Sequence, residues 1–302
     1  MRRPIEVTRT LLRRIPLPQP DADSDKDERG RVLAVGGSAE TPGAILLAGV
    51  AALRAGAGKL QMATVNSAAS SLACSVPESL VVSLGETRAG EISAGAPVRG
   101  LARRAAGVDA LLIGPGMSSE GAAGRLVRGL AHRLRPDATL VLDAAAVVAL
   151  RRATDVLRGT TASVVLTPHA GEMASLLDVE KGDVESDPAG VAREAAARLG
   201  AVVVLKGPVS WIAEPEGALY RYDGGTVGLA TSGSGDTLAG VVAGLAARGT
   251  SATHAAVWGA YLHGAAGRAL ARRVGRIGYL ARELLDEIPP LMDRLGRPRR
   301  AG

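Results

Sequence analysis

A short stretch that joins two glycines to an acid, Ser232-Gly233-Ser234-Gly235-Asp236, is the part of this sequence best suited to chemistry. Hydrophobic residues at helical spacing begin directly afterwards at Leu238, so the stretch is predicted to form a turn at a helix N-terminus. Free backbone N–H groups at such a turn bind phosphate, and Asp236 could take a proton from a hydroxyl group. The stretch therefore indicates phosphoryl transfer to a hydroxyl, although a glycine-rich turn with an acid in the first helical turn is a purely structural alternative.

Three other polar residues stand where they could reach a ligand. His169 follows Pro168 at a predicted strand end, and it could donate to a ligand or bond only to the backbone. Glu172 could cap the next helix or hold a metal-bound water near phosphates. Lys206 ends an apolar run, where its charge either meets an anion or extends to solvent at the strand end.

Short hydrophobic runs alternate with helical patterns along the chain. This alternation predicts an α/β fold in a single domain, with a mainly parallel, doubly wound sheet flanked by helices on both faces. The predicted strands are 32–35, 60–64, 80–84, 110–113, 140–142, 164–167, 202–205 and 210–213. The predicted helices are 44–55, 121–134, 144–150, 172–177, 191–199, 236–247 and 252–273.

Polar or glycine-rich turns follow five of these strands. The turns begin at Gly36, Gly114, Asp143, Pro168 and Lys206. Ligands of open α/β sheets bind beyond the carboxyl ends of the strands, so the five turns are predicted to line one shared site.

The basic charge of the chain is concentrated at its two ends. The net charge of +6 and the pI near 10 would fit a nucleic-acid-binding protein. Residues 1–14 carry five Arg and one Glu, and residues 293–302 carry four Arg and one Asp, which leaves −1 for residues 15–292. We therefore expect no nucleic-acid partner, and we divide the chain into an Arg-rich stub and linker (1–30), one domain (31–292) and a basic tail (293–302). Both ends are expected to be solvated. Because every proposed site residue lies between 36 and 236, deletion of residues 1–14 and 294–302 is expected to leave activity nearly unchanged.

The cysteine count and the hydropathy exclude several classes. Cys74 is the only cysteine, which excludes an intramolecular disulfide and a multi-cysteine metal site and fits a cytoplasmic location. No run approaches the ~18 apolar residues of a membrane span, and the N-terminus lacks the apolar core of a signal peptide, so no membrane partner is expected.

Taken in order over residues 31–290, these segments resemble the ADP/ATP-dependent NAD(P)H-hydrate dehydratases of the ribokinase-like superfamily. The Gly-x-Gly-Asp turn at 233–236 marks only the superfamily. Two segments are specific to the family, Thr167-Pro168-His169-Ala170-Gly171-Glu172 and Ala52-Leu53-Arg54-Ala55-Gly56-Ala57-Gly58. The other matching pieces are Gly36-Gly37-Ser38, Pro42-Gly43-Ala44, Ile113-Gly114-Pro115-Gly116-Met117, Leu142-Asp143-Ala144, Val204-Leu205-Lys206-Gly207 and Tyr261-Leu262-His263-Gly264. Ser232 departs from the glycine common at the start of the anion turn.

The resemblance implies a reaction and a set of site residues. The 6-hydroxyl of NADHX or NADPHX, the hydrates of NADH and NADPH, would be phosphorylated from ADP or ATP, and loss of phosphate would restore the dihydronicotinamide. Asp236 would be the catalytic base, and together with Ala44, Gly116 and His169 it would bind the hydrate. The nucleotide would contact Lys206, Gly207, Pro208, Val209, Ser210, Gly233, Ser234 and Gly235. Mg2+ would neutralise phosphate charge, with Glu172 as a helper and no ligands assigned, and the family's assembly implies a homotetramer.

Two other functions fit the anion turn. A ribokinase-like kinase for a vitamin precursor or a sugar would leave a stable phosphoester. A non-catalytic nucleotide sensor would keep the pocket without turnover, although the intact Asp236, Gly233 and Gly235 argue against it.

Overall fold

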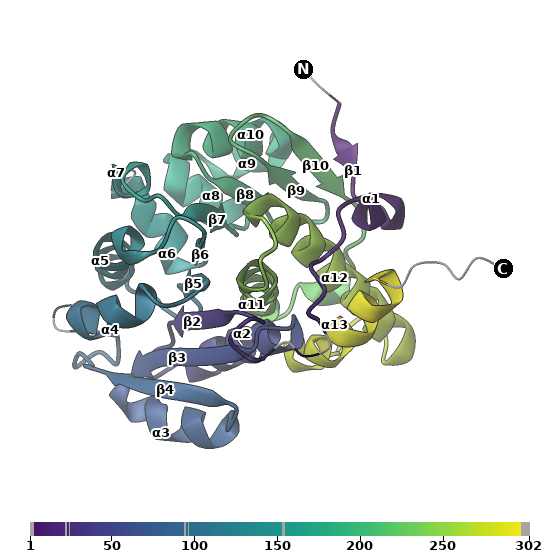
Figure 1. Ribbon diagram of the computed structural model, residues 1–302. Coiled ribbons are helices and arrows are strands. Elements are labelled where there is room, and N and C mark those ends of the chain that lie inside the picture. The colour runs from purple at the N-terminus through teal and green to yellow at the C-terminus, as the bar shows by residue number, and fades with distance from the viewer. Residues whose placement is uncertain are drawn as a thin grey trace.

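One ten-stranded sheet forms the centre of the computed structural model, which describes residues 3–21, 23, 25–93, 95, 97–152 and 155–296 (Figure 1). The strands are β1 (Ile5–Glu6), β2 (Arg31–Val35), β3 (Lys59–Val65), β4 (Ser79–Leu84), β5 (Ala110–Ile113), β6 (Thr139–Leu142), β7 (Ser163–Leu166), β8 (Val202–Leu205), β9 (Ser210–Ala213) and β10 (Leu219–Tyr222). Their order across the sheet is β1-β10-β9-β8-β7-β6-β5-β2-β3-β4, and β9 alone runs antiparallel to its neighbours.

Helices cover both faces of this sheet. They are α1 (Arg9–Arg14), α2 (Pro42–Arg54), α3 (Asn66–Ser75), α4 (Pro97–Ala105), α5 (Glu120–Leu130), α6 (Ala145–Val148), α7 (Asp155–Arg158), α8 (Ala170–Leu177), α9 (Lys181–Ser186), α10 (Pro188–Leu199), α11 (Ser234–Ala247), α12 (Ala252–Arg273) and α13 (Ala281–Gly296). Short 3-10 turns are η1 (Ala131–Arg133), η2 (Ala149–Arg152) and η3 (Val227–Leu229).

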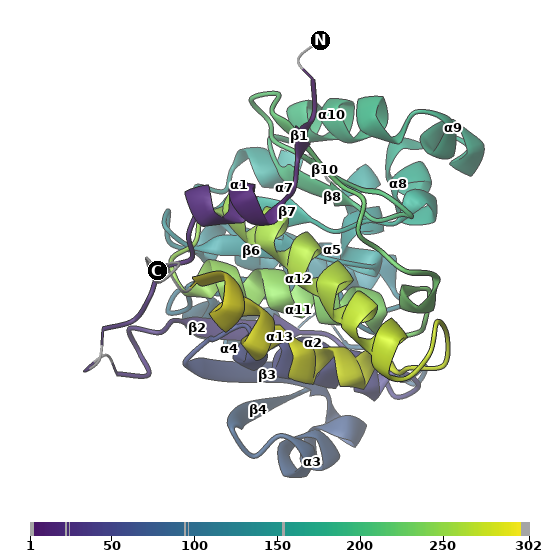
Figure 2. The same cartoon turned by 90° about the vertical axis from the view of Figure 1, so that its right-hand side faces the viewer.

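Each face of the sheet has its own hydrophobic core, built mostly from Ala, Val and Leu. One core joins the sheet to α2, α11, α12 and α13, which Figure 2 shows from the outside. The other joins the opposite face to α4, α5, α8 and α10. Helix α11 is buried along almost its whole length because it lies between α2, α12 and the middle of the sheet. The mainly parallel sheet with helices on both faces is therefore confirmed.

All eight predicted strands are present, and every predicted helix overlaps a helix of the structure. The predicted helices 121–134 and 144–150 end in the 3-10 turns η1 and η2. Sequence patterns missed β1, β10, α3, α4, α7, α9 and α13. Helix α13 was missed because Pro289 and Pro290 lie inside it, where proline removes backbone donors and disfavours the helical pattern.

The N-terminal segment is not the solvated stub expected from its charge. Val7 donates its N–H to the carbonyl of Arg221 at 2.8 Å, which joins this segment to β10. The Leu12 side chain is fully buried, and the Trp258 indole N–H donates to the carbonyl of Ile15 at 2.7 Å. The buried side chains Val7, Leu12 and Leu17 are interspersed with exposed arginines, and they make this segment part of the hydrophobic core. At the other end, α13 runs to Gly296, beyond the expected start of the basic tail, and residues 297–302 lie outside the described residues.

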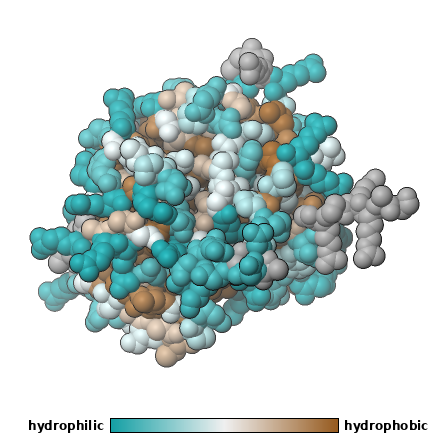
Figure 3. Space-filling model, viewed as in Figure 1, coloured by the Kyte–Doolittle hydropathy of each residue, from teal (hydrophilic) through white to brown (hydrophobic). Residues whose placement is uncertain are grey.

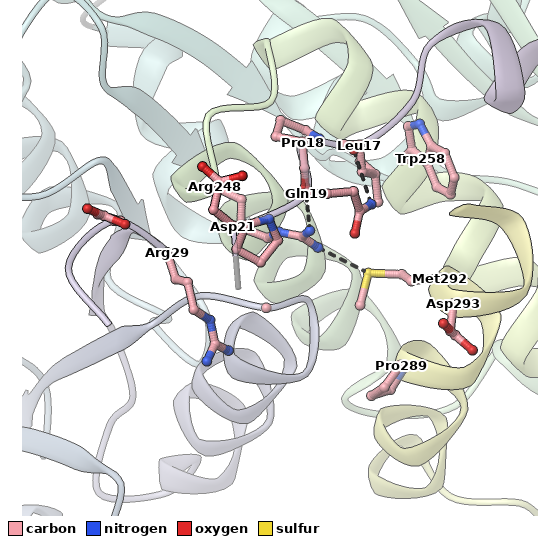
Figure 4. Close-up of a pocket in the computed structure, with 13 residues that line it drawn as sticks. Leu17, Pro18, Gln19, Asp21, Arg29, Arg248, Trp258, Pro289, Met292 and Asp293 are labelled. Carbon is pink, nitrogen blue, oxygen red and sulfur yellow. Dashed lines mark hydrogen bonds between the residues drawn. The ribbon is translucent and has the colours of Figure 1, made fainter. Parts of the chain in front are cut away.

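A cavity of about 770 Å³ lies between the N-terminal segment and α13 (Figure 4). Arg248, at the C-terminal end of α11, crosses it and donates to the carbonyl of Pro18 at 2.7 Å, while its other terminal nitrogen lies 3.7 Å from the Met292 sulfur. None of the predicted site residues lines this cavity, so it belongs to the packing of the N-terminal segment rather than to the predicted site.

Candidate functional site

The five predicted turns come together because they follow five adjacent strands. Strands β8, β7, β6, β5 and β2 are consecutive neighbours and parallel, so all five end at the same edge of the sheet. One further pairing extends the β7–β8 ladder beyond the strands, where the Lys206 N–H donates to the carbonyl of Pro168 at 2.8 Å. This pairing holds His169 and Lys206 side by side at the edge.

Lys206 is the electrostatic centre of the site. Its Nζ lies 3.0 Å from Asp143 Oδ1 and 3.7 Å from Glu172 Oε2, while Thr167 donates its hydroxyl to the same Asp143 oxygen at 2.7 Å. Burial alone would lower the pKa of Lys206, but the charges of Asp143, Glu172 and Asp236 outweigh burial and raise it. Lys206 therefore stays positively charged at neutral pH and can meet an anionic ligand.

Asp236 lies in the first turn of α11, beside this cluster. Burial raises the pKa of Asp236 to about 6, the negative charge of Asp143 acts in the same direction, and Lys206 opposes both. A carboxyl group with a pKa just below neutral is ionised at pH 7 and still able to accept a proton, which suits a general base. The position and the pKa thus agree with the predicted catalytic role.

The anion turn requires its glycines. Gly233 has φ +86°, and a Cβ there would lie 2.4 Å from Leu47 Cδ1, so the N-terminus of α11 closes against α2. A Cβ at Gly235 would lie 3.1 Å from Lys206 Nζ, which places the turn and the lysine together. Ser234 is engaged elsewhere, because its hydroxyl shares a 2.8 Å hydrogen bond with His263 Nε2. The cradle therefore consists of backbone N–H groups at the positive end of α11, with the charge of Lys206 beside it.

His169 and Glu172 form the start of α8. His169 Nδ1 accepts the backbone N–H groups of Gly171 and Glu172 at 3.0 and 3.2 Å, and Glu172 Oε2 accepts the His169 N–H at 2.8 Å. In this capping box His169 bonds to the backbone and Glu172 caps α8, as the structural alternatives for the two residues predict. The His169 side chain is 57% exposed, although its Nε2 lies 3.4 Å from Glu172 Oε1, so a substrate that bonds to Nε2 would share this atom with Glu172.

Ala44 and Gly116 meet on the other side of the site. Gly116 has φ +68°, and a Cβ there would lie 2.8 Å from that of Ala44 and 2.6 Å from the carbonyl of Thr41. The Thr41 hydroxyl donates to the carbonyl of Gly116 at 2.8 Å. A Cβ at Gly114 would overlap the carbonyl of Asp143, so the turn that contains Gly114 and Gly116 packs directly against the residue that pairs with Lys206.

The remaining predicted nucleotide contacts continue the chain from Lys206. Residues 207–209 form the turn between β8 and β9, and Ser210 opens β9, paired with Tyr222. A Cβ at Gly225 would lie 3.4 Å from the carbonyl of Pro208, so this turn lies beside the segment that leads to the anion turn.

Sequence reasoning did not assign Asp143 a role in the site. Its carboxylate is 3% exposed and is the closest acid to Lys206. The following residue, Ala144, has φ +48° and ψ −128°, which is rare for a residue with a side chain and marks a strained turn. A signal was present, since Asp143 directly follows a buried strand, but its pairing depends on the register of β6, β7 and β8.

A family model described as NAD(P)H-hydrate dehydratase matches residues 32–290, a span that contains every site residue described above. The chain belongs to the NAD(P)H-hydrate dehydratase family. It is 50% identical over 291 residues to the ADP-dependent (S)-NAD(P)H-hydrate dehydratase of Xanthomonas campestris, covering 96% of this chain and 97% of that protein. The family resemblance inferred from the sequence motifs is therefore confirmed.

Solved structures support the same assignment. The ADP/ATP-dependent NAD(P)H-hydrate dehydratase of Bacillus subtilis, co-crystallized with ATP/Mg2+, superposes with a TM-score of 0.82 at 30% identity and covers 98% of this chain and 99% of that one. Ribokinase from Thermotoga maritima shares the fold, with a TM-score of 0.55 at 15% identity, covering 88% of this chain and 99% of that one. The ribokinase-like fold is thus confirmed, while the closer sequence similarity is to the dehydratases.

The described residues contain no helix that is both long and apolar enough to cross a membrane. They also contain no group of three His, Cys, Asp or Glu side chains arranged to hold a metal ion. A Mg2+ ion that enters with the nucleotide needs no such cage, because its ligands are usually phosphate oxygens, waters and one or two carboxylates.

Proposed function

We propose that this chain repairs NADHX and NADPHX, restoring NADH and NADPH at the expense of ADP or ATP. The observation that carries the proposal is the placement of Asp236, with a pKa of about 6, directly after the phosphate-binding turn of α11 and within the electrostatic influence of the charged Lys206. ADP as the phosphoryl donor is supported by the activity named for the Xanthomonas campestris relative. A homotetramer and a cytoplasmic location stay predictions from the resemblance and the cysteine count.

The first step is transfer of a phosphoryl group to the hydroxyl on carbon 6. Asp236 accepts the hydroxyl proton while the oxygen attacks the terminal phosphorus of the nucleotide, and AMP or ADP leaves. Backbone N–H groups around Gly233–Gly235 bind the transferring phosphoryl group, and Lys206 supplies a fixed positive charge beside it. Mg2+ that binds with the nucleotide would neutralise phosphate charge, and Glu172 is proposed to assist by holding a metal-bound water.

The second step is elimination. Hydroxide is a poor leaving group, whereas phosphate leaves readily, so loss of phosphate from carbon 6 and of a proton from carbon 5 restores the ring double bond. Ala44, Gly116 and His169 are the residues proposed to hold the hydrated ring. Because Ala44 and Gly116 touch each other, any larger side chain at either position would narrow this part of the site.

The test is a coupled measurement of both products. Purified protein is incubated with NADHX, Mg2+ and either ADP or ATP, and the recovery of NADH absorbance and the release of phosphate are followed together. Equal amounts of NADH and phosphate are expected. A stable phosphoester with no NADH would point to a kinase, and nucleotide binding without turnover would point to a sensor; either result would refute the proposal.

A further inference from the structure

A basic cavity of about 710 Å³ lies at the opposite edge of the sheet from the proposed active site. It is lined by Arg31, Lys59, Gln61, Arg99, Gly100, Arg103, Arg104 and Gly107. Arg31 and Lys59 open β2 and β3, whereas the active-site turns follow the other ends of the strands. The five residues of β2, at about 3.3 Å per residue, separate the two edges by about 16 Å.

The charges around this cavity do not balance. Its described lining holds five cationic side chains and no acid. Arg31 and Lys59 both pair with the carboxylate of Asp27, and the charges of Asp109 and Asp25 also act on Arg31, so these two cations are compensated in part. Arg104 donates to the Gln61 side-chain oxygen at 2.6 Å, which orients the guanidinium group without neutralising it. This local excess is not a consequence of overall basicity, because residues 15–292 carry a net charge of −1.

Helix α4 supplies three of these arginines in an arrangement that opposes its own stability. Arg99 lies in the first turn, where a positive charge opposes the helix dipole. Arg99 and Arg103 stand four residues apart on one exposed face, a like-charge spacing that disfavours a helix, and neither has a hydrogen-bond or ion-pair partner among the described residues. The dipole would explain Arg103 and Arg104 in the last turn, but it does not explain Arg99.

Gly100 keeps the wall of the cavity open between Arg99 and Arg103. Glycine is unfavourable inside a helix. Among the described residues, and apart from the chain neighbours and backbone of α4 itself, no atom lies within 4 Å of the position that a Cβ would take here, so packing does not require glycine. The surface over α4 is strongly hydrophilic (Figure 3). Unpaired arginines around an open backbone are suited to a ligand with several phosphate groups, since arginine donates paired hydrogen bonds to phosphate oxygens.

From these features we infer a second anion site, formed by Arg31, Lys59, Arg99, Arg103 and Arg104, for a small ligand that carries two or more linked phosphate groups. The volume lies in the range of small-molecule sites. The site is distinct from the phosphate-binding turn at Gly233–Gly235, and its occupation does not depend on the proposed dehydratase activity.

Calorimetric titration with tripolyphosphate tests the inference, in a phosphate-free buffer at low ionic strength. The wild-type protein should show two classes of site, one at the α11 turn and one at the basic cavity. Arg99→Gln combined with Arg103→Gln should weaken the second class at least tenfold and leave the first class and the turnover unchanged. The matched control, Arg125→Gln with Arg128→Gln, removes the same charge from exposed positions on α5 and should titrate like the wild type. Thermal unfolding checks that both double variants are folded.

Three results would overturn the inference. A wild-type protein whose tripolyphosphate binding is unchanged by Arg99→Gln with Arg103→Gln, whether it shows one class of sites or two, would remove the second site. If both double variants bound tripolyphosphate equally more weakly than the wild type, the loss would be an effect of net charge and not of a specific site. Binding of a short DNA duplex more tightly than tripolyphosphate, lost on substitution of Arg99 and Arg103, would identify a nucleic-acid surface instead. Loss of turnover in the wild-type assay would contradict the proposed function alone, because the titration needs no catalysis.

Discussion

Lys206 Nζ and Asp143 Oδ1 lie 3.0 Å apart, in an ion pair whose side chains are only 18% and 3% exposed. The pair links the ends of β6 and β8 across β7, and it places a fixed positive charge next to the phosphate-binding turn. A buried pair of this kind adds little net stability, since desolvation offsets attraction, but removal of one partner leaves an uncompensated charge. Its value here lies in holding the lysine where a nucleotide phosphate would bind.

Substitution of Lys206 should therefore lower the stability of the fold, and substitution of its partner Asp143 should restore most of that stability. We expect Lys206→Met to lower the free energy of unfolding by about 3–5 kcal/mol, because the buried Asp143 carboxylate loses its cation. Lys206→Met combined with Asp143→Asn should recover most of that loss without restoring nucleotide binding. Urea denaturation measures both variants. Arg151→Met, which breaks the exposed pair with Asp178, is the control and should lower the free energy of unfolding by less than about 1 kcal/mol. An equal loss of stability in Lys206→Met and Arg151→Met would disprove the argument.

Asp236→Asn should make the protein more stable and much less active. The pKa of Asp236 is about 6 in the folded protein and 3.8 ordinarily, so keeping the carboxylate charged at pH 7 costs at most about 3 kcal/mol. The folded state binds the proton more tightly, so this contribution falls away below pH 4 and is fully destabilising above pH 6. The variant should gain up to that amount at pH 7, gain nothing at pH 4, and lose roughly two to four orders of magnitude in turnover.

Stability curves at both pH values check the Asp236 prediction. Asp137→Asn, at an exposed position, is the control and should change the free energy of unfolding by no more than about 0.5 kcal/mol at either pH. A wild-type turnover rate in a folded, nucleotide-binding Asp236→Asn protein would remove Asp236 from the mechanism. In the wild type, turnover should fall on the acid side as pH drops through about 6, because the base becomes protonated.

The location of the site could be predicted from the sequence because it depends on topology. Continuous apolar runs mark buried parallel strands, and in a doubly wound sheet the turns after neighbouring strands meet at one edge. Gly36, Gly114 and Lys206 lie at the shared edge that this reasoning predicts. The glycines of the anion turn could be predicted too, since the need for a positive φ at Gly233 is local.

Pairwise contacts across the sheet could not be predicted in the same way. Whether Lys206 meets Asp143 depends on the register of three strands, which a hydrophobic pattern leaves open. The burial of Leu12 depends on a docking surface formed by residues more than 200 positions later. The high density of arginines in residues 1–14 predicted a solvated N-terminus, and this prediction was wrong because the sequence does not show that docking surface.

Leu12→Ala should destabilise the protein although it lies in the segment expected to be dispensable. The side chain is fully buried, so its truncation should cost about 2–5 kcal/mol. Arg13→Ala, in the same helix and exposed, should stay within about 0.5 kcal/mol of the wild type. Thermal unfolding separates the two. Turnover of Leu12→Ala at low temperature should be normal, because no site residue lies in α1; equal stabilities of the two variants would show that α1 is not part of the folded core.

The two glycines of the anion turn should respond differently to alanine. At Gly233 the positive φ and the contact with Leu47 predict a loss of about 1–3 kcal/mol in stability. At Gly235 the Cβ meets only the flexible end of Lys206, so stability should change little while nucleotide affinity falls about tenfold. Gly182→Ala, with open space in α9, should raise stability by about 0.5–1 kcal/mol. Nucleotide titration and unfolding of all three variants decide the matter, and unchanged nucleotide affinity in Gly235→Ala would separate this glycine from the nucleotide site.

Protonation of His263 should destabilise the fold in mild acid, an effect that protonation of Asp236 offsets in the wild-type protein. Burial, together with the charge of Lys206, lowers the pKa of His263 to about 4, so the ring is neutral when it bonds to Ser234. Because the unfolded chain protonates near pH 6.5 and the folded one only near 4, stability is complete above pH 6.5 and falls by up to about 3 kcal/mol as the pH drops to 4. Asp236 acts in the opposite direction over nearly the same pH range, so the loss of stability should be clearest in the Asp236→Asn background.

Two double variants in the Asp236→Asn background test the role of His263. Adding His263→Gln, which can keep a hydrogen bond to Ser234, should flatten the decline in stability, whereas adding His254→Gln should not. Parallel stability curves between pH 7 and 4 for the two double variants would show that protonation of His263 is not what destabilises the fold.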